Sequence, residues 1–106
     1  MPPKNLYLTG KAARYLRGLG HHLAPKAMLG REGITPTLRE SVLAILTADE
    51  LIKVKIQEGC PLGKTEAAEG LAAATHSRIA QIIGRTFLLF RPNPERKPDQ
   101  KIILPK

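Results

Sequence analysis

The segment 26–36 restricts the fold more than any other part of the sequence. It consists of a short apolar stretch, a turn of the form G-x-x-G at residues 30–33, and the start of a helix. Thr35 has a side chain that can cap a helix N-terminus, and Pro36 suits the first helical position, where no backbone N–H donor is needed. The segment therefore predicts a strand that turns directly into a helix.

The two glycines of this turn also affect what it could bind. Gly30 and Gly33 carry no Cβ, so the backbone can turn tightly and a polyanion can approach the main chain. Backbone N–H groups and the helix N-terminus would then face its phosphates, and KH domains clamp nucleotide backbone with a loop of this form. Arg31 in the loop and Lys26 before it add positive charge. An ordinary strand-to-helix turn could contain the same residues.

The charge of the chain favours an anionic partner. The sequence has 106 residues, enough for one domain, and its 17 Lys and Arg against 9 Asp and Glu give a net charge of +8. Residues 1–31 contain no acidic residue, and residues 71–106 contain only Glu95 and Asp99. We therefore expect the two ends of the chain to form a positive surface, although a basic surface that only aids solubility would have the same composition.

Apolar spacing and turn residues predict the remaining elements. We expect helices at 9–20, 35–48 and 64–76 and strands at 25–29, 50–58, 78–83 and 86–91. Gly84-Arg85 is a two-residue connection typical of a tight hairpin. Strands joined through helices require a partly parallel sheet, and the hairpin adds an antiparallel strand. The sequence therefore predicts a two-layer α/β domain of order α-β-α-β-α-β-β.

Two of these elements have a basic side. In helix 9–20, one predicted face is apolar and the opposite face is basic, the first formed by Ala12, Tyr15, Leu16 and Leu19 and the second by Lys11, Arg14 and Arg17. In strand 50–58, Lys53 and Lys55 alternate with apolar residues, which predicts one buried and one basic side. A solvated strand face would look the same. His21, just after the first helix, could cap it, pack against the fold or contact RNA.

The sequence shows no sign of an enzyme or a metal centre. Segment 59–65 resembles a P-loop, but it has three residues between its glycines where a P-loop has four, and Pro61 has no N–H to offer a phosphate. The three histidines lack Cys or carboxylate neighbours at ligand spacing, and Cys60 is the only cysteine. We therefore expect no catalytic residue, no cofactor and no small-molecule substrate.

Four blocks in order along the chain resemble the CRM domain family (chloroplast RNA splicing and ribosome maturation), in its stand-alone bacterial YhbY-type form. The blocks are Leu16–His21, Leu29–Thr35, Leu51–Ile56 and Gln81–Pro92. The resemblance implies a four-stranded mixed sheet with three helices, similar to the C-terminal domain of translation initiation factor three. It also implies RNA binding, with the family's G-x-x-G loop at Gly30–Gly33, and association with precursors of the large ribosomal subunit.

We therefore expect a cytoplasmic, monomeric RNA-binding protein that assists ribosome assembly and does not contact a membrane. The expected RNA-binding residues are Lys11, Arg14, Arg17, His21, Lys26, Gly30, Arg31, Gly33, Lys53, Lys55 and Arg85. The expected organisation is a flexible arm (1–8), the RNA-binding domain (9–92) and an irregular tail (93–106). A module that docks an acidic or ribosomal protein, or a nonspecific nucleic-acid-binding protein, remains an alternative.

Overall fold

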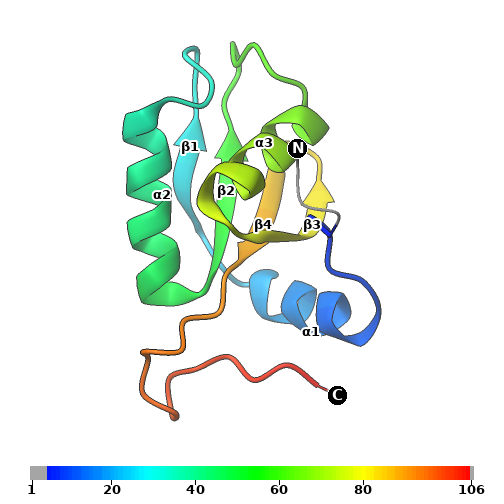
Figure 1. Ribbon diagram of the computed structural model, residues 1–106. Coiled ribbons are helices and arrows are strands. Elements are labelled where there is room, and N and C mark those ends of the chain that lie inside the picture. The colour runs from blue at the N-terminus through cyan, green and yellow to red at the C-terminus, as the bar shows by residue number, and fades with distance from the viewer. Residues whose placement is uncertain (1–4, 106) are drawn as a thin grey trace.

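A four-stranded sheet forms the centre of the molecule (Figure 1). The computed structural model describes residues 5–105, so residues 1–4 of the expected arm and residue 106 of the expected tail lie outside the described residues. The elements follow the predicted order: α1 (Gly10–Gly20), β1 (Pro25–Leu29), α2 (Pro36–Asp49), β2 (Leu51–Ile56), α3 (Lys64–Thr75), β3 (Arg78–Ile83) and β4 (Thr86–Phe90). The predicted fold class is confirmed.

The order of strands across the sheet is β1-β2-β4-β3. β1 pairs with β2 in parallel, whereas β4 runs antiparallel to both β2 and β3. The predicted mixed sheet is therefore present, with the hairpin β3–β4 as its antiparallel part. Because β4 inserts between β2 and β3, β2 becomes a central strand, and side chains on its two sides face the middle of the two sheet surfaces.

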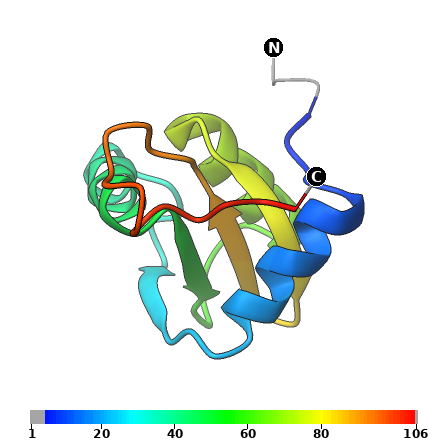
Figure 2. The same ribbon diagram turned by 90° about the horizontal axis from the view of Figure 1, so that it is seen from below.

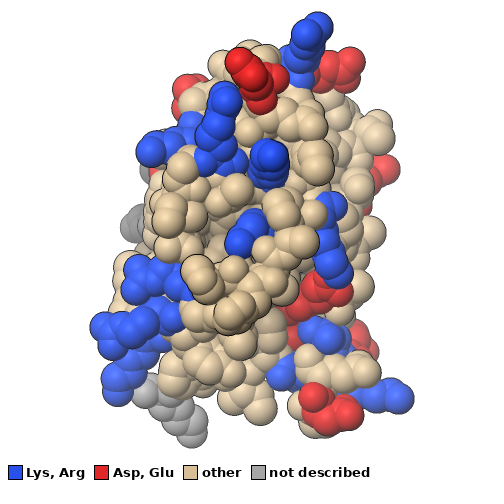
Figure 3. Space-filling view, turned by 180° about the vertical axis from the view of Figure 1, so that it is seen from behind, with Lys and Arg blue, Asp and Glu red and all other residues tan. Residues whose placement is uncertain are grey.

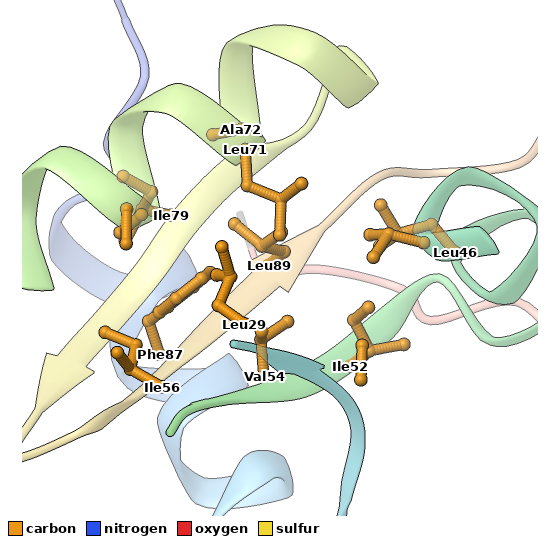
Figure 4. Packing of buried hydrophobic residues seen from close by; sticks show 14 residues of the cluster. Leu29, Leu46, Ile52, Val54, Ile56, Leu71, Ala72, Ile79, Phe87 and Leu89 are labelled. Carbon is orange, nitrogen blue, oxygen red and sulfur yellow. The ribbon is translucent and has the colours of Figure 1, made fainter. Parts of the chain in front are cut away.

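Helices α2 and α3 cover one surface of the sheet, and α1 lies across one end of the other (Figures 1 and 2). The larger core lies between the sheet and α2 and α3 (Figure 4), and it includes Leu29, Ile52, Val54, Ile79, Phe87 and Leu89 from the strands and Val42, Leu46 and Leu71 from the helices. A smaller core lies beneath α1 and the C-terminal segment, formed by Leu16, Leu51, Ala80, Leu88 and Phe90. The rest of this second surface carries the side chains considered below.

The apolar face predicted for α1 is partly wrong. Leu16 is buried as predicted, but Tyr15 and Leu19 are exposed by 42% and 39%. The buried residues of α1 are instead Ala13 and Gly20, together with Leu16. Gly20 packs so closely on the sheet that an added Cβ would collide with the Leu88 side chain. The helix therefore contacts the sheet along Ala13, Leu16 and Gly20 and not along its most apolar side.

Both ends of the described chain form hydrogen bonds with the rest of the domain. Leu6 and Leu8 form backbone hydrogen bonds with Ile79 of β3. At the other end, the Glu50 carboxylate is buried and accepts hydrogen bonds from the backbone N–H groups of Asn93 and Ile102, each at 2.8 Å. It also accepts a hydrogen bond from the Arg96 guanidinium, at 3.0 Å. The tail has no helix or strand within residues 93–105, yet Glu50 fixes its path beside β2.

Candidate nucleic-acid interface

The G-x-x-G loop connects β1 to α2 at one end of the sheet. A hydrogen bond from Gly33 N–H to the Gly30 carbonyl, at 3.1 Å, closes the turn. Gly33 has a φ of +66°, a conformation that favours glycine. Thr35 caps α2 as predicted, since its Oγ1 accepts a hydrogen bond from the Leu38 N–H at 3.1 Å. The loop thus has a defined backbone, with exposed Arg31 at its tip.

The loop after β2, which includes the start of the segment that resembled a P-loop, lies beside this turn. Gln57 N–H donates to the Leu29 carbonyl at 2.8 Å, which continues the pairing of β1 and β2 beyond their ends. The Arg31 side chain then lies along Gly59, where a Cβ would be 3.4 Å from the Arg31 Cγ. Segment 57–63 therefore packs beside the G-x-x-G loop, and Gly59 has a φ of +93°, a conformation that favours glycine.

A first hollow lies at the G-x-x-G loop. Its volume is about 410 Å³, and its lining combines loop residues with the ends of β1, β2 and α2, namely Met28, Gly30, Arg31, Glu32, Gly33, Thr35, Leu38 and Gln57. Met28 is 50% exposed, and its sulfur accepts a hydrogen bond from the Gln57 amide at 3.1 Å. The lining contains one basic and one acidic side chain, Arg31 and Glu32.

A second hollow lies where α1 crosses the sheet. Its volume is about 330 Å³, and its lining is Arg17 and Gly18 from α1, His21 directly after α1, Lys53 from β2, Gln81 and Ile83 from β3, and Thr86, Phe87 and Leu88 from β4. Figure 3 shows this side of the molecule, with Lys and Arg side chains around a hollowed centre. The structure thus brings three predicted residues, Arg17, His21 and Lys53, around one depression.

The open side of β2 joins the two hollows. Lys55 is exposed and stands opposite Met28 of β1 in the strand register, and Met28 lines the first hollow. Lys53 lies two residues earlier on the same side of β2 and lines the second hollow. Side chains two apart in a strand share one face. The hollows and the two lysines therefore form one continuous surface, which we call the basic face.

Arg85 lies at the edge of the basic face. Its carbonyl accepts a hydrogen bond from the Ile56 N–H at 2.7 Å, so the β3–β4 turn meets the end of β2. Ile56 is also the register partner of Leu29, the last residue before the G-x-x-G loop. The loop and Arg85 consequently flank the same end of the central strand.

Three predicted residues, Lys11, Arg14 and Lys26, line neither hollow, whereas His21 lines the second one. Lys11 and Arg14 are exposed, and helical spacing puts them on the side of α1 that continues from His21. Lys26 forms an ion pair with Asp49, which offsets its charge locally. The His21 backbone N–H bonds to the Arg17 carbonyl, while its ring lies edge-on to the His22 ring, 5.2 Å between centroids.

Several residues of the basic face were not predicted, namely Gly18, Met28, Gln81, Ile83 and Thr86. The alternation in β1 could have indicated that Met28 shares a side with Lys26. The residues of β3 and β4 meet α1 only because of the strand order, for which the sequence carries no local signal.

Within residues 5–105, no group of three or more His, Cys, Asp or Glu residues is arranged to hold a metal ion. Over the same range, no helix is both long and apolar enough to cross a membrane.

The family description of the CRS1 / YhbY (CRM) domain matches residues 8–91. The chain belongs to the CRM family. The match covers α1 through β4, so it includes both hollows, and it confirms the resemblance drawn from the sequence.

Curated relatives of this CRM chain cover most of its length. "Probable RNA-binding protein YqeI" of Bacillus subtilis is 37% identical over 90 residues, which is 85% of this chain and 94% of that protein. "Probable RNA-binding protein MJ0652" of Methanocaldococcus jannaschii is 37% identical over 103 residues, 90% of this chain and 76% of that protein. A Haemophilus influenzae protein named "RNA-binding protein" is 34% identical over 90 residues, 85% of this chain and 91% of its own.

A solved structure has the same fold. The solution structure of the hypothetical protein SAV1595 from Staphylococcus aureus aligns with a TM-score of 0.76 and 38% sequence identity. The alignment covers 92% of this chain and 99% of SAV1595.

Proposed function

We propose that this CRM protein binds ribosomal RNA through its basic face, associates with precursors of the large ribosomal subunit and assists their assembly without catalysing a reaction. The observation that carries the proposal is the continuity of the basic face, on which the G-x-x-G loop, Lys55 and the hollow at Arg17 and Lys53 follow one another. The names of the relatives support RNA as the partner.

The spacing of charges along the basic face suits a nucleic-acid backbone. Lys53 and Lys55 are separated by one residue of an extended strand, which is about 7 Å at about 3.4 Å per residue. Successive phosphates of an RNA strand could therefore meet successive cations from α1 to the G-x-x-G loop. The chain has four aromatic residues, and Phe87 and Phe90 are buried. Affinity would thus come from phosphate contacts more than from stacking on aromatic rings.

The predicted RNA-binding residues would then have different roles in RNA binding. Gly30 and Gly33 would let the RNA backbone approach the loop, and Arg31, Arg17, Lys53, Lys55 and Arg85 would neutralise phosphates. His21 would line the second hollow. Lys11 and Arg14 would contact RNA beyond that hollow, and Lys26, held by Asp49, would contribute least. We assign the RNA-binding unit to residues 9–92, in a monomer that acts in the cytoplasm.

The proposal is tested first by RNA affinity. Five phosphate contacts would give a log–log slope of affinity against salt of about −3.5, at about −0.7 per contact for a single strand. Arg31→Glu should weaken binding strongly, whereas Lys97→Glu should change it little, because Lys97 is an exposed cation of the tail. Equal losses of RNA affinity in the two variants would mean that only the net charge of the protein determines binding. The basic face would then no longer be assigned as the RNA-binding surface.

The ribosomal part of the proposal needs a separate experiment. Cell lysate is sedimented through sucrose gradients at low and high salt, and each fraction is probed for the protein. We expect it with large-subunit particles or their precursors at low salt and at the top of the gradient at high salt. A protein that stays at the top in both salts would contradict the ribosomal assignment.

A further inference from the structure

Gly18 is a glycine that the fold itself does not explain. It lies inside α1 and has no positive φ, so the backbone does not require glycine there. A Cβ added at Gly18 would meet nothing within 4 Å outside its own stretch of helix, whereas at Gly20, two residues later, it would collide with Leu88. Glycine in a helix interior costs about 1 kcal/mol relative to alanine. Neither packing nor conformation offsets that cost at Gly18.

The position of Gly18 suggests a reason for its small size. Gly18 lines the second hollow between Arg17 and His21, with Lys53 across from them on the sheet. A side chain at this position would project into the open space at the hollow. The missing side chain thus lets a ligand approach the backbone of α1 closely, between cationic groups.

The hollow combines three kinds of surface. Arg17 and Lys53 give it a cationic rim, and Ile83, 60% exposed, gives it an apolar patch on the sheet. Thr86 Oγ1 donates to the Ile83 carbonyl at 3.0 Å, so the lone pairs of this hydroxyl stay available to accept. Gln81 is half-buried beside it and brings an amide donor and acceptor. A phosphate, a flat apolar ring and polar ring edges are the matching groups, and a nucleotide has all three.

We propose that the second hollow holds one unstacked nucleotide of a single-stranded RNA segment. Its phosphate lies at Gly18 between Arg17 and Lys53, and its base lies on Ile83 with its edge toward Gln81 and Thr86. The volume of about 330 Å³ is at the lower end of the range of about 300–1,000 Å³ found for small-ligand sites. This inference rests on the proposed RNA-binding function, and it adds that the RNA is unpaired at this point.

A preference for single strands follows from the cost of extracting a base. A paired base must leave its stack to enter the hollow, at a free-energy cost of a few kcal/mol. For a base in a loop or single strand this cost is small. Phosphate contacts elsewhere on the basic face do not distinguish unpaired from duplex RNA. The hollow would therefore supply the discrimination between unpaired and duplex RNA.

The test fills the hollow at Gly18 and compares two RNAs. Affinities for a mixed-sequence single strand and for its perfect duplex are measured by fluorescence anisotropy for the wild type, Gly18→Ala and Gly18→Leu. Ala44→Leu adds similar bulk at an exposed position of α2 on the other side of the sheet and serves as the matched control. Gly18→Ala should also unfold at a higher temperature, because alanine favours the helix. A loss of affinity in that variant cannot come from failed folding.

We expect Gly18→Leu to lower single-strand affinity by about tenfold or more and duplex affinity by less than about twofold, with a smaller loss in Gly18→Ala. Ala44→Leu should change neither affinity. Single-strand affinity that is unchanged in Gly18→Leu, or that falls in parallel with duplex affinity, overturns the nucleotide site while leaving RNA binding in place. A wild type that binds neither RNA overturns the proposed function as well.

Discussion

Replacing Glu50 with glutamine should destabilise the protein by about 3 kcal/mol, the lower end of the range for breaking a buried ion pair. The Glu50 side chain is 2% exposed, and each of its oxygens accepts a hydrogen bond from the backbone of the C-terminal segment. Glutamine keeps the shape but turns one oxygen into an N–H donor, which would face the backbone N–H of either Asn93 or Ile102. The lower end applies because Arg96, at 20% exposure, can be hydrated when it loses its partner.

The loss is measured by urea unfolding, followed by far-UV circular dichroism. For a domain of this size, about 3 kcal/mol corresponds to a fall in Tm of about 12–24 °C. Glu95→Gln makes the same chemical change at an exposed position of the same segment and should alter the free energy of unfolding by less than about 0.5 kcal/mol. If Glu50→Gln is as stable as Glu95→Gln, the carboxylate does not hold the C-terminal segment and the reasoning is refuted.

Three further predictions have defined outcomes. Gly20→Ala should destabilise the fold by about 1–3 kcal/mol in chemical unfolding because the added methyl group overpacks the contact of α1 with the sheet, and unchanged stability would count against that contact. Lys53→Ala should weaken RNA binding and reduce the salt slope by about 0.7, whereas Lys26→Ala, whose ammonium is paired, should leave the slope nearly unchanged; equal effects would contradict this. The Tyr7 hydroxyl donates to the Glu69 carboxylate at 2.7 Å, which, with burial, raises the pKa of Tyr7 to about 12. The stabilisation from this contact should be complete below about pH 10 and disappear as the pH rises through about 12. Glu69→Gln should move the tyrosinate absorbance titration of Tyr7 back toward 10, and an unmoved titration would exclude the carboxylate as the cause.

The elements of the fold were predictable because their signals are local. Thr35 and Pro36 mark the start of α2 through the chemistry of its first turn, and the structure shows the predicted cap. Alternation in β2 and the two-residue turn of the hairpin are equally local. The inward side of α1 was not predictable in this way. Tyr15 and Leu19 are the more apolar choice, but the close approach at Gly20 depends on Leu88, far along the chain.

Several residues of the basic face were predictable from the sequence, but their arrangement on one surface was not. The sequence identified Arg17, His21, Lys53 and the G-x-x-G loop individually, but not their common surface. That surface depends on β4 lying between β2 and β3 and on α1 crossing the side opposite α2 and α3. The role of Glu50 was missed for the same reason, because its partners lie 43 to 52 residues away in the sequence.

The central claim is that RNA binds the basic face, and mapping amide chemical shifts during a titration with single-stranded RNA tests it most directly. We expect the largest changes at Gly18 and His21, along β2 at Lys53 and Lys55, and in the loop 30–33. The exposed surfaces of α2 and α3 should change little. Shifts concentrated on α2 and α3, with the basic face unchanged, would contradict the account.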